Sequence, residues 1–176
     1  MYKRQILDLL QRQRRVLIAG GAGTGKTIIA REKAIRLSSE GMKTLLLCYN
    51  RPLADHIREQ CQASLNLDVA TFHQLCDKWI RRAQKEIGTN FLQKANRDYP
   101  KADKYDQLMP LALSNAVDAL GPKYDAIIVD EAQDFGDDYW LPIEMLLNKL
   151  DDGLLYIFLD ENQDICLLYT SPSPRD

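Results

Sequence analysis

The chain alternates between short apolar runs and longer segments in which apolar residues recur at helical spacing. The apolar runs predict five β-strands, at residues 15–19, 43–49, 67–71, 124–129 and 154–159. The helical spacing predicts helices at residues 2–12, 28–39, 52–63, 72–87, 106–120 and 139–150. Near-continuous apolar strands that alternate with helices are typical of α/β proteins, in which helices cover both faces of a parallel sheet.

Turn residues mark the ends of several predicted elements. Gly41 is a C-cap signal for the helix before it, and Pro52 suits the first turn of the helix it begins. Gly121 and Pro122 close the helix predicted at 106–120. Residues 88–104 are polar and irregular, so we expect a loop or a weak helix there.

Composition places the chain among ordinary globular domains. A length of 176 residues is enough for one domain with a substantial core. The residues are 45% hydrophobic and 27% charged, which is ordinary for a globular protein. The net charge of −2 gives no domain-wide basic surface for nucleic acid, although it leaves room for a local basic patch. The longest apolar runs are too short to span a bilayer, and the first residues lack the apolar core of a signal peptide.

The four cysteines predict buried thiols rather than a metal site or disulfides. Cys48, Cys61, Cys76 and Cys166 form no C-x-x-C pair, and none has a histidine at metal-ligand spacing. Free cysteine behaves as a small hydrophobic residue, and this usage fits a reducing compartment. We therefore expect a cytoplasmic protein.

The segment 20–27 reads GGAGTGKT, which fits the phosphate-binding P-loop pattern G-x-x-x-x-G-K-[ST]. A predicted strand precedes it and a predicted helix follows it, as the motif requires. The alternative is a glycine-rich turn with a chance Lys-Thr pair. Lys26 is expected to reach the β- and γ-phosphates, and the Thr27 hydroxyl to hold Mg²⁺. The predicted phosphate-binding residues are Gly20, Gly21, Ala22, Gly23, Thr24, Gly25, Lys26 and Thr27.

A second site is predicted where an apolar strand ends in two acids, in the segment 124–134, YDAIIVDEAQD. This is the Walker B arrangement. Asp130 is expected to hold Mg²⁺ opposite Thr27, and Glu131 to orient and deprotonate the attacking water. The alternative is a pair of surface acids at a strand end, which the upstream P-loop disfavours.

Together, GGAGTGKT and DEAQD resemble the motifs of UvrD/Rep-like superfamily 1 helicases. LLLCYNRPL at 45–53, TFH at 71–73 and LDENQDI at 159–165 are similar to further motifs of that family. The resemblance covers about residues 2–165 and implies a RecA-like P-loop NTPase domain. It looks most like the compact helicase-like domains that follow a nuclease-related domain. The strand at 154–159 is then expected between the P-loop strand and the Asp130 strand of a five-stranded parallel sheet.

The family resemblance also implies activity and residue roles. It implies an ATPase with DNA helicase-like activity, with ATP and Mg²⁺ as cofactors. Gln5 would read the adenine, Gln163 would sense the γ-phosphate, and Gln133 would act with Gln163 as a relay. The segments 45–53 and 71–73 would approach single-stranded nucleic acid. Arg51, Arg58, Arg81, Arg82 and Lys85 are candidate phosphate contacts, or simply a solvated face.

The sequence departs from the family pattern in three places. Leu159 stands in a glycine place, Asp164 stands where serine is usual, and the insertion at about 88–122 is short. The short insertion puts strand separation in doubt but not ATP binding.

Residues 166–176 contain two Ser-Pro pairs and resemble a translated sequencing adapter, so we expect a non-native tail after residue 165. A second RecA-like domain with its arginine finger would then be missing, and hydrolysis would be about 10³–10⁵-fold slower.

Two alternatives stay open. The segment 148–151 matches the N-K-x-D motif of GTPases and 118–121 matches D-x-x-G, but both close predicted helices instead of following strands. A nucleotide-gated module that binds nucleic acid or protein without unwinding is the other reading.

Overall fold

The computed structural model describes residues 13–61, 66–149 and 152–160. The predicted helix at 2–12 with Gln5, the segment from 161 onward with Gln163, and the expected tail at 166–176 lie outside the described residues.

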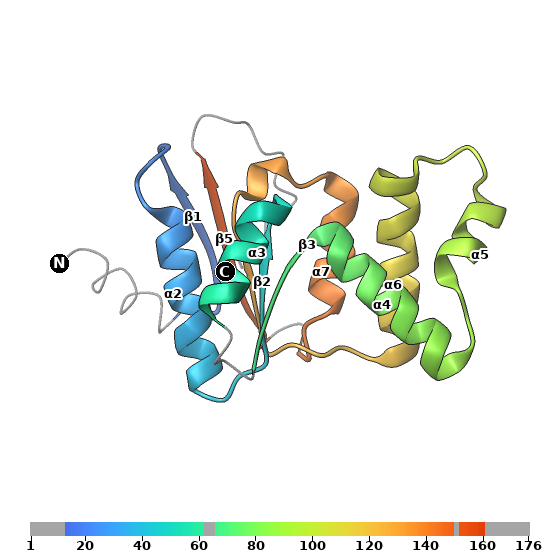
Figure 1. The fold of residues 1–176 in the computed structure, drawn as a ribbon, viewed down its shortest axis with the longest axis horizontal. Helices are drawn as coiled ribbons and strands as arrows, with labels where there is room; N and C mark the ends of the chain where they lie inside the picture. The colour runs from blue at the N-terminus through green and yellow to red at the C-terminus, as the bar shows by residue number, and fades with distance from the viewer. Residues whose placement is uncertain (1–12, 62–65, 150–151, 161–176) are drawn as a thin grey trace, which may run out of the picture.

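Five parallel strands form one sheet (Figure 1). They are β1 (Arg15–Gly20), β2 (Thr44–Cys48), β3 (Leu67–Thr71), β4 (Ala126–Val129) and β5 (Leu154–Asp160). Their order in the sheet is β1-β5-β4-β2-β3, which confirms the prediction that the last strand lies between the P-loop strand and the Asp130 strand. β1 therefore pairs with β5, although about 140 residues separate them in sequence.

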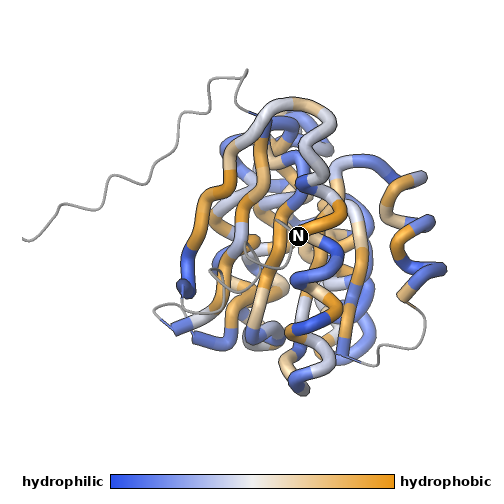
Figure 2. Tube along the Cα trace, turned by 90° about the vertical axis from the view of Figure 1, so that its left-hand side faces the viewer, coloured by the Kyte–Doolittle hydropathy of each residue, from blue (hydrophilic) through white to orange (hydrophobic). Residues whose placement is uncertain are grey.

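Helices cover both faces of the sheet because the side chains of the central strands alternate between two apolar cores. On one face, Leu46 and Cys48 pack with α2 (Lys26–Ser39) and α3 (Arg51–Gln60). On the other, Leu45 and Leu47 pack with α4 (Phe72–Ile87), α6 (Met109–Leu120) and α7 (Trp140–Met145). In Figure 2 the strands are coloured largely as hydrophobic, whereas the helices alternate. The sequence-based prediction of an α/β fold is confirmed.

Residues 88–104, for which the sequence predicts a loop or a weak helix, contain a regular helix, α5 (Phe91–Asp98), that packs against α4 and α6. The Asn90 side chain caps it by accepting the Gln93 N–H at 3.0 Å, and Phe91 and Ala95 are buried one turn apart. A π-helical turn, η2 (Lys104–Leu108), follows, so α6 begins at Met109 and not at 106. In addition, α7 ends at Met145, which is earlier than the 139–150 pattern predicts.

The start of α4 is fixed by a capping box. The Thr71 hydroxyl accepts the Gln74 N–H at 3.3 Å, and the Gln74 side chain accepts the Thr71 N–H at 3.0 Å. Because α4 follows β3 with no loop, its first residues, Phe72 and His73, lie at the carboxyl edge of the sheet. The same edge carries the P-loop and the end of β4.

The described cysteines Cys48, Cys61 and Cys76 are buried free thiols, as the sequence predicts, whereas Cys166 lies outside the described residues. Burial and the nearby negative charge of Asp130 raise the pKa of Cys48 to about 12, so this thiol stays protonated at neutral pH. Among the helices that the structure describes, none has the length and apolar character needed to cross a membrane.

Candidate nucleotide site

The loop between β1 and α2 has the backbone conformation of a phosphate cradle. Gly23 has φ 76° and Gly25 has φ 86°, and residues other than glycine rarely adopt this left-handed backbone conformation. Gly25 caps α2, and its carbonyl accepts the N–H groups of Ile28 and Ile29, each at 3.1 Å. The amides of Lys26 and Thr27 precede the first of these bonds, so the start of α2 presents donors and partial positive charge to an anion.

Lys26 lies inside this loop and is only 7% exposed. Its Nζ donates to the carbonyl oxygens of Gly20 at 2.8 Å and Gly21 at 3.0 Å, and it forms an ion pair with Asp160 at the end of β5. The ammonium group is therefore already at the mouth of the loop, where phosphate oxygens would be received.

Asp130 follows β4 and is only 1% exposed, and neither carboxylate oxygen has a hydrogen-bond partner among the described residues. Burial, together with the nearby negative charge of Glu131, raises the pKa of Asp130 to about 6, although the Thr27 hydroxyl and the charge of Lys26 act in the opposite direction. A buried carboxylate without donors is costly unless a cation compensates it. The unsatisfied oxygens and the nearby Thr27 hydroxyl are the oxygen ligands that Mg²⁺ prefers, so these residues fit the ion.

Glu131 has an unusual backbone. Its φ of 55° and ψ of 48° make it the only non-glycine residue with positive φ in the described part of the chain. Its carboxylate accepts a hydrogen bond from the side-chain Nε2 of Gln133 at 2.7 Å. The side-chain Oε1 of Gln133 in turn accepts the backbone N–H of Asp160 at 3.1 Å. Strained backbone conformations cluster at functional sites, where the surrounding structure holds them. Gln133 thus connects the end of β5 to the candidate general base.

The fold brings most of the predicted site residues to one edge of the sheet. The loop residues 20–27, Asp130 and Glu131 all lie at the carboxyl ends of β1 and β4. Sequence reasoning missed Asp160 as the ion-pair partner of Lys26. The strand order holds the signal for it, because the sheet register places Asp160 opposite Gly20.

An aromatic pocket of about 370 Å³ lies farther along the same edge. Phe72 stacks on Tyr139 with ring centroids 3.9 Å apart, and His73 contacts Tyr139 edge-on. The Tyr139 hydroxyl donates to Asp106 at 2.8 Å. Tyr49, which follows β2, is 54% exposed at the pocket and leaves one aromatic ring open to solvent. The remaining lining residues are Asp134, Phe135 and Gly136.

The five basic residues considered as phosphate contacts do not form one patch. Arg58 is structural, because its guanidinium donates to the Val69 carbonyl at 3.2 and 2.8 Å along the edge strand. Arg81, Arg82 and Lys85 lie about two and a half to three and a half turns into α4, on the order of 14 Å or more from its start. Arg51, the first residue of α3, is the member that lies at the carboxyl edge.

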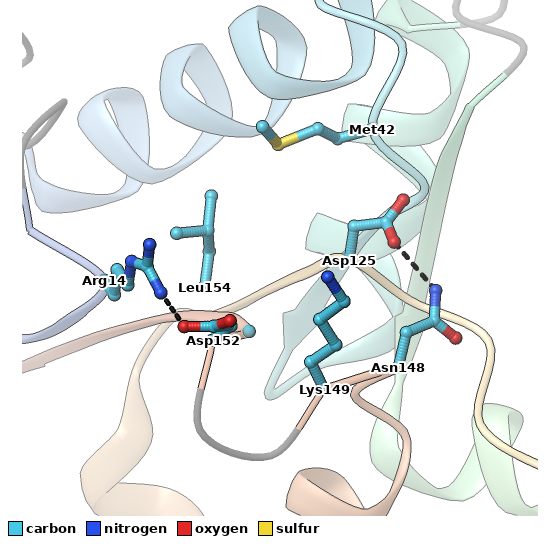
Figure 3. A pocket seen from close by; sticks show the side chains of 8 residues that line it. Arg14, Met42, Asp125, Asn148, Lys149, Asp152 and Leu154 are labelled. Carbon is cyan, nitrogen blue, oxygen red and sulfur yellow. Dashed lines mark hydrogen bonds and ion pairs between the residues drawn. The ribbon is translucent and has the colours of Figure 1, made fainter.

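Asn148 and Lys149, the first two residues of the N-K-x-D match, lie at the other end of the sheet. Asn148 and Lys149 line a pocket of about 340 Å³ with Asp125 and Leu154, at the amino ends of β4 and β5 (Figure 3). The Asn148 amide donates to Asp125 at 2.7 Å. The P-loop lies at the carboxyl ends of the strands, so Asn148 and Lys149 are far from any base bound beside it.

A family model described as an AAA domain matches residues 3–168, which is nearly the whole chain. No curated protein matches the sequence.

Proposed function

The chain belongs to the AAA domain family, a group of P-loop NTPase domains, and from this premise we propose that it binds Mg·ATP and hydrolyses it. The observation that carries the proposal is the pair of unsatisfied oxygens on buried Asp130, at the edge that also carries the Lys26 loop. A buried acid with this environment is destabilising in isolation and is compensated by a bound cation.

Each residue has a definite task in this proposal. The loop amides and Lys26 bind and orient the phosphates, and Thr27 and Asp130 hold the metal. When bound, Mg²⁺ supplies positive charge that neutralises the transferring phosphoryl group. Glu131 orients the attacking water and accepts its proton, and Gln133 holds the Glu131 carboxylate in place. Gln5 and Gln163, outside the described residues, would read the adenine and the γ-phosphate.

We further propose a helicase-like role on single-stranded nucleic acid, with residues 1–165 as one RecA-like domain. The aromatic pocket supports it, because bases stack on exposed aromatic side chains regardless of sequence. Asp134 and Phe135 of this pocket continue directly from the DEAQ residues that include Glu131. A second RecA-like domain would supply an arginine to the γ-phosphate, as the family resemblance implies.

The second candidate function is a nucleotide-gated module that binds nucleic acid or protein without unwinding. The compact region between β3 and β4 favours it, because α4, α5 and α6 pack on each other and share one apolar core with that face of the sheet. Both candidates require Mg·ATP, and they differ in whether a duplex is separated.

Titration of the 176-residue chain with a fluorescent ATP analogue tests the nucleotide proposal. We expect saturable binding that needs Mg²⁺ and that unlabelled ATP competes away better than GTP. We expect slow hydrolysis in the same preparation, because the family resemblance assigns the arginine at the γ-phosphate to a separate RecA-like domain. Binding without Mg²⁺, or a preference for GTP, would contradict the proposal.

Replacing Tyr49 by alanine is expected to weaken single-stranded DNA binding about tenfold, because one stacking surface is lost. Fluorescence anisotropy at low salt with a labelled oligothymidylate measures the change. Tyr99→Ala is the matched control, since Tyr99 is equally exposed but lies at the end of α5. If the two substitutions weakened binding equally, the aromatic pocket would not be the surface that binds nucleic acid.

A further inference from the structure

We propose that Asp160 sets the affinity of the phosphate loop for nucleotide by holding Lys26 until a phosphate displaces it. The inference rests on the proposed function, since it concerns the same loop, but it assigns a new role to a residue at the end of β5. Asp160 acts through Lys26 and is therefore a positioning residue.

The sheet itself brings the two side chains together. β1 and β5 are parallel neighbours, and their register pairs Gly20 with Asp160. Gly20 is the first residue of the loop, so the last residue of β5 necessarily lies beside the loop entrance. The placement depends on backbone pairing along the full length of β1.

All three N–H donors of the Lys26 ammonium group already take part in hydrogen bonds. Lysine carries three N–H donors, and here three oxygens receive them: the Gly20 carbonyl, the Gly21 carbonyl and the Asp160 carboxylate. To bind a phosphate, Lys26 has to give up at least one of these contacts. The carboxylate is the acceptor that carries a full charge, so it is the strongest competitor with phosphate.

Asp160 also stays in place after Lys26 leaves. Its backbone N–H is held by the Gln133 side chain at 3.1 Å, and Gln133 is in turn bound to Glu131. The freed carboxylate would then face the incoming phosphates next to Glu131 and Asp134. Burial and the negative charges of Glu131 and Asp160 together raise the pKa of Asp134, which supports an accumulation of negative charge here. Because Lys26 is expected to reach both the β- and the γ-phosphate, competition from Asp160 for this ammonium group should weaken the binding of ATP more than that of ADP, which has no γ-phosphate.

Asp160→Asn tests the proposal, with dissociation constants for Mg·ATP and Mg·ADP measured by calorimetry. We expect about tenfold tighter ATP binding and a smaller gain for ADP, since one charge-assisted contact no longer has to be broken. The variant without nucleotide should melt at a lower temperature, while ATP should raise its melting temperature more than it raises that of the wild type. A merely structural role would lower the melting temperature but leave this ATP-induced shift unchanged.

Two further variants sharpen the result. Asp160→Glu keeps the charge and should retain affinity close to that of the wild type. Asp152→Asn removes the partner of Arg14 at the opposite end of the sheet, and nucleotide affinity should not change. If the Asn variant does not fold, Asp160→Ser removes the same carboxylate with a smaller side chain.

The outcomes separate this inference from the proposed function. If the wild type binds Mg·ATP but neutral variants at Asp160 bind it no more tightly, the inference is overturned and the proposed function stands. Weaker ATP binding by the neutral variants would also overturn it, because Asp160 would then support the nucleotide. If the wild type binds no nucleotide, both fall.

Discussion

Replacing Glu131 by glutamine is expected to lower the rate of ATP hydrolysis about 10²–10⁴-fold while leaving Mg·ATP binding intact. Glutamine has nearly the same shape and keeps an oxygen that can accept the Gln133 N–H now found at 2.7 Å. It cannot accept the proton of an attacking water. The substitution therefore removes the chemistry of the general base and preserves the geometry around it.

Single-turnover hydrolysis at saturating Mg·ATP, together with equilibrium binding, measures the two quantities separately. Glu144→Gln is the matched control, because Glu144 is a partly buried acid on α7 that pairs with Arg15. A Glu131→Gln variant that hydrolyses ATP at the wild-type rate would show that another group activates the water.

The second large effect is expected from Lys26→Met, which should weaken Mg·ATP binding about 100-fold or more. Methionine keeps the apolar stem but loses the ammonium group, and charge-assisted contacts to the β- and γ-phosphates are lost together. Calorimetry with ATP measures the affinity, and thermal unfolding shows whether the variant is folded.

Lys33→Met is the control for this substitution. Lys33 is another buried lysine on α2, and its ammonium group lies 4.7 Å from the centre of the Tyr156 ring. The same chemical change there should leave nucleotide affinity unaltered, although the free energy of unfolding can change. Equal loss of ATP binding in both variants would mean that the effect comes from α2 as a whole and not from contact with phosphate.

The sequence predicts the elements whose apolar pattern is long and regular. The bounds of β3 and α4 agree with prediction to the residue, because Thr71 caps a helix whose buried face repeats clearly. For α5 the sequence predicts only a loop or a weak helix, since this helix buries just two residues and its main signal is a single capping asparagine, Asn90. The π-helical turn before α6 depends on local hydrogen bonding to Asp103, which periodicity does not report.

In the candidate site too, features encoded in one short segment can be predicted from the sequence, whereas contacts between distant segments cannot. GGAGTGKT and the Asp130–Glu131 pair can be identified from sequence because each is a contiguous string beside a strand. The ion pair between Lys26 and Asp160 joins residues 134 positions apart and is predictable only once the strand order is known. The aromatic pocket combines residues from four separate segments, including Tyr49, His73, Asp106 and Tyr139. No spacing rule along the chain connects them.

The order of the strands also constrains when a functional molecule can exist during synthesis. Among the described strands, β1 lies at the edge of the sheet and β5 is its one partner, and β5 is also the last of these strands to leave the ribosome. Pairings between such distant segments pay a large loop-closure cost and form slowly. The phosphate loop is thus synthesised early, but the strand that leads into it, β1, can pair with β5 only after residues 154–160 have been made. Acquisition of nucleotide binding would accordingly report that the nascent chain has closed its sheet, and ATP would stabilise the finished fold over partly synthesised ones.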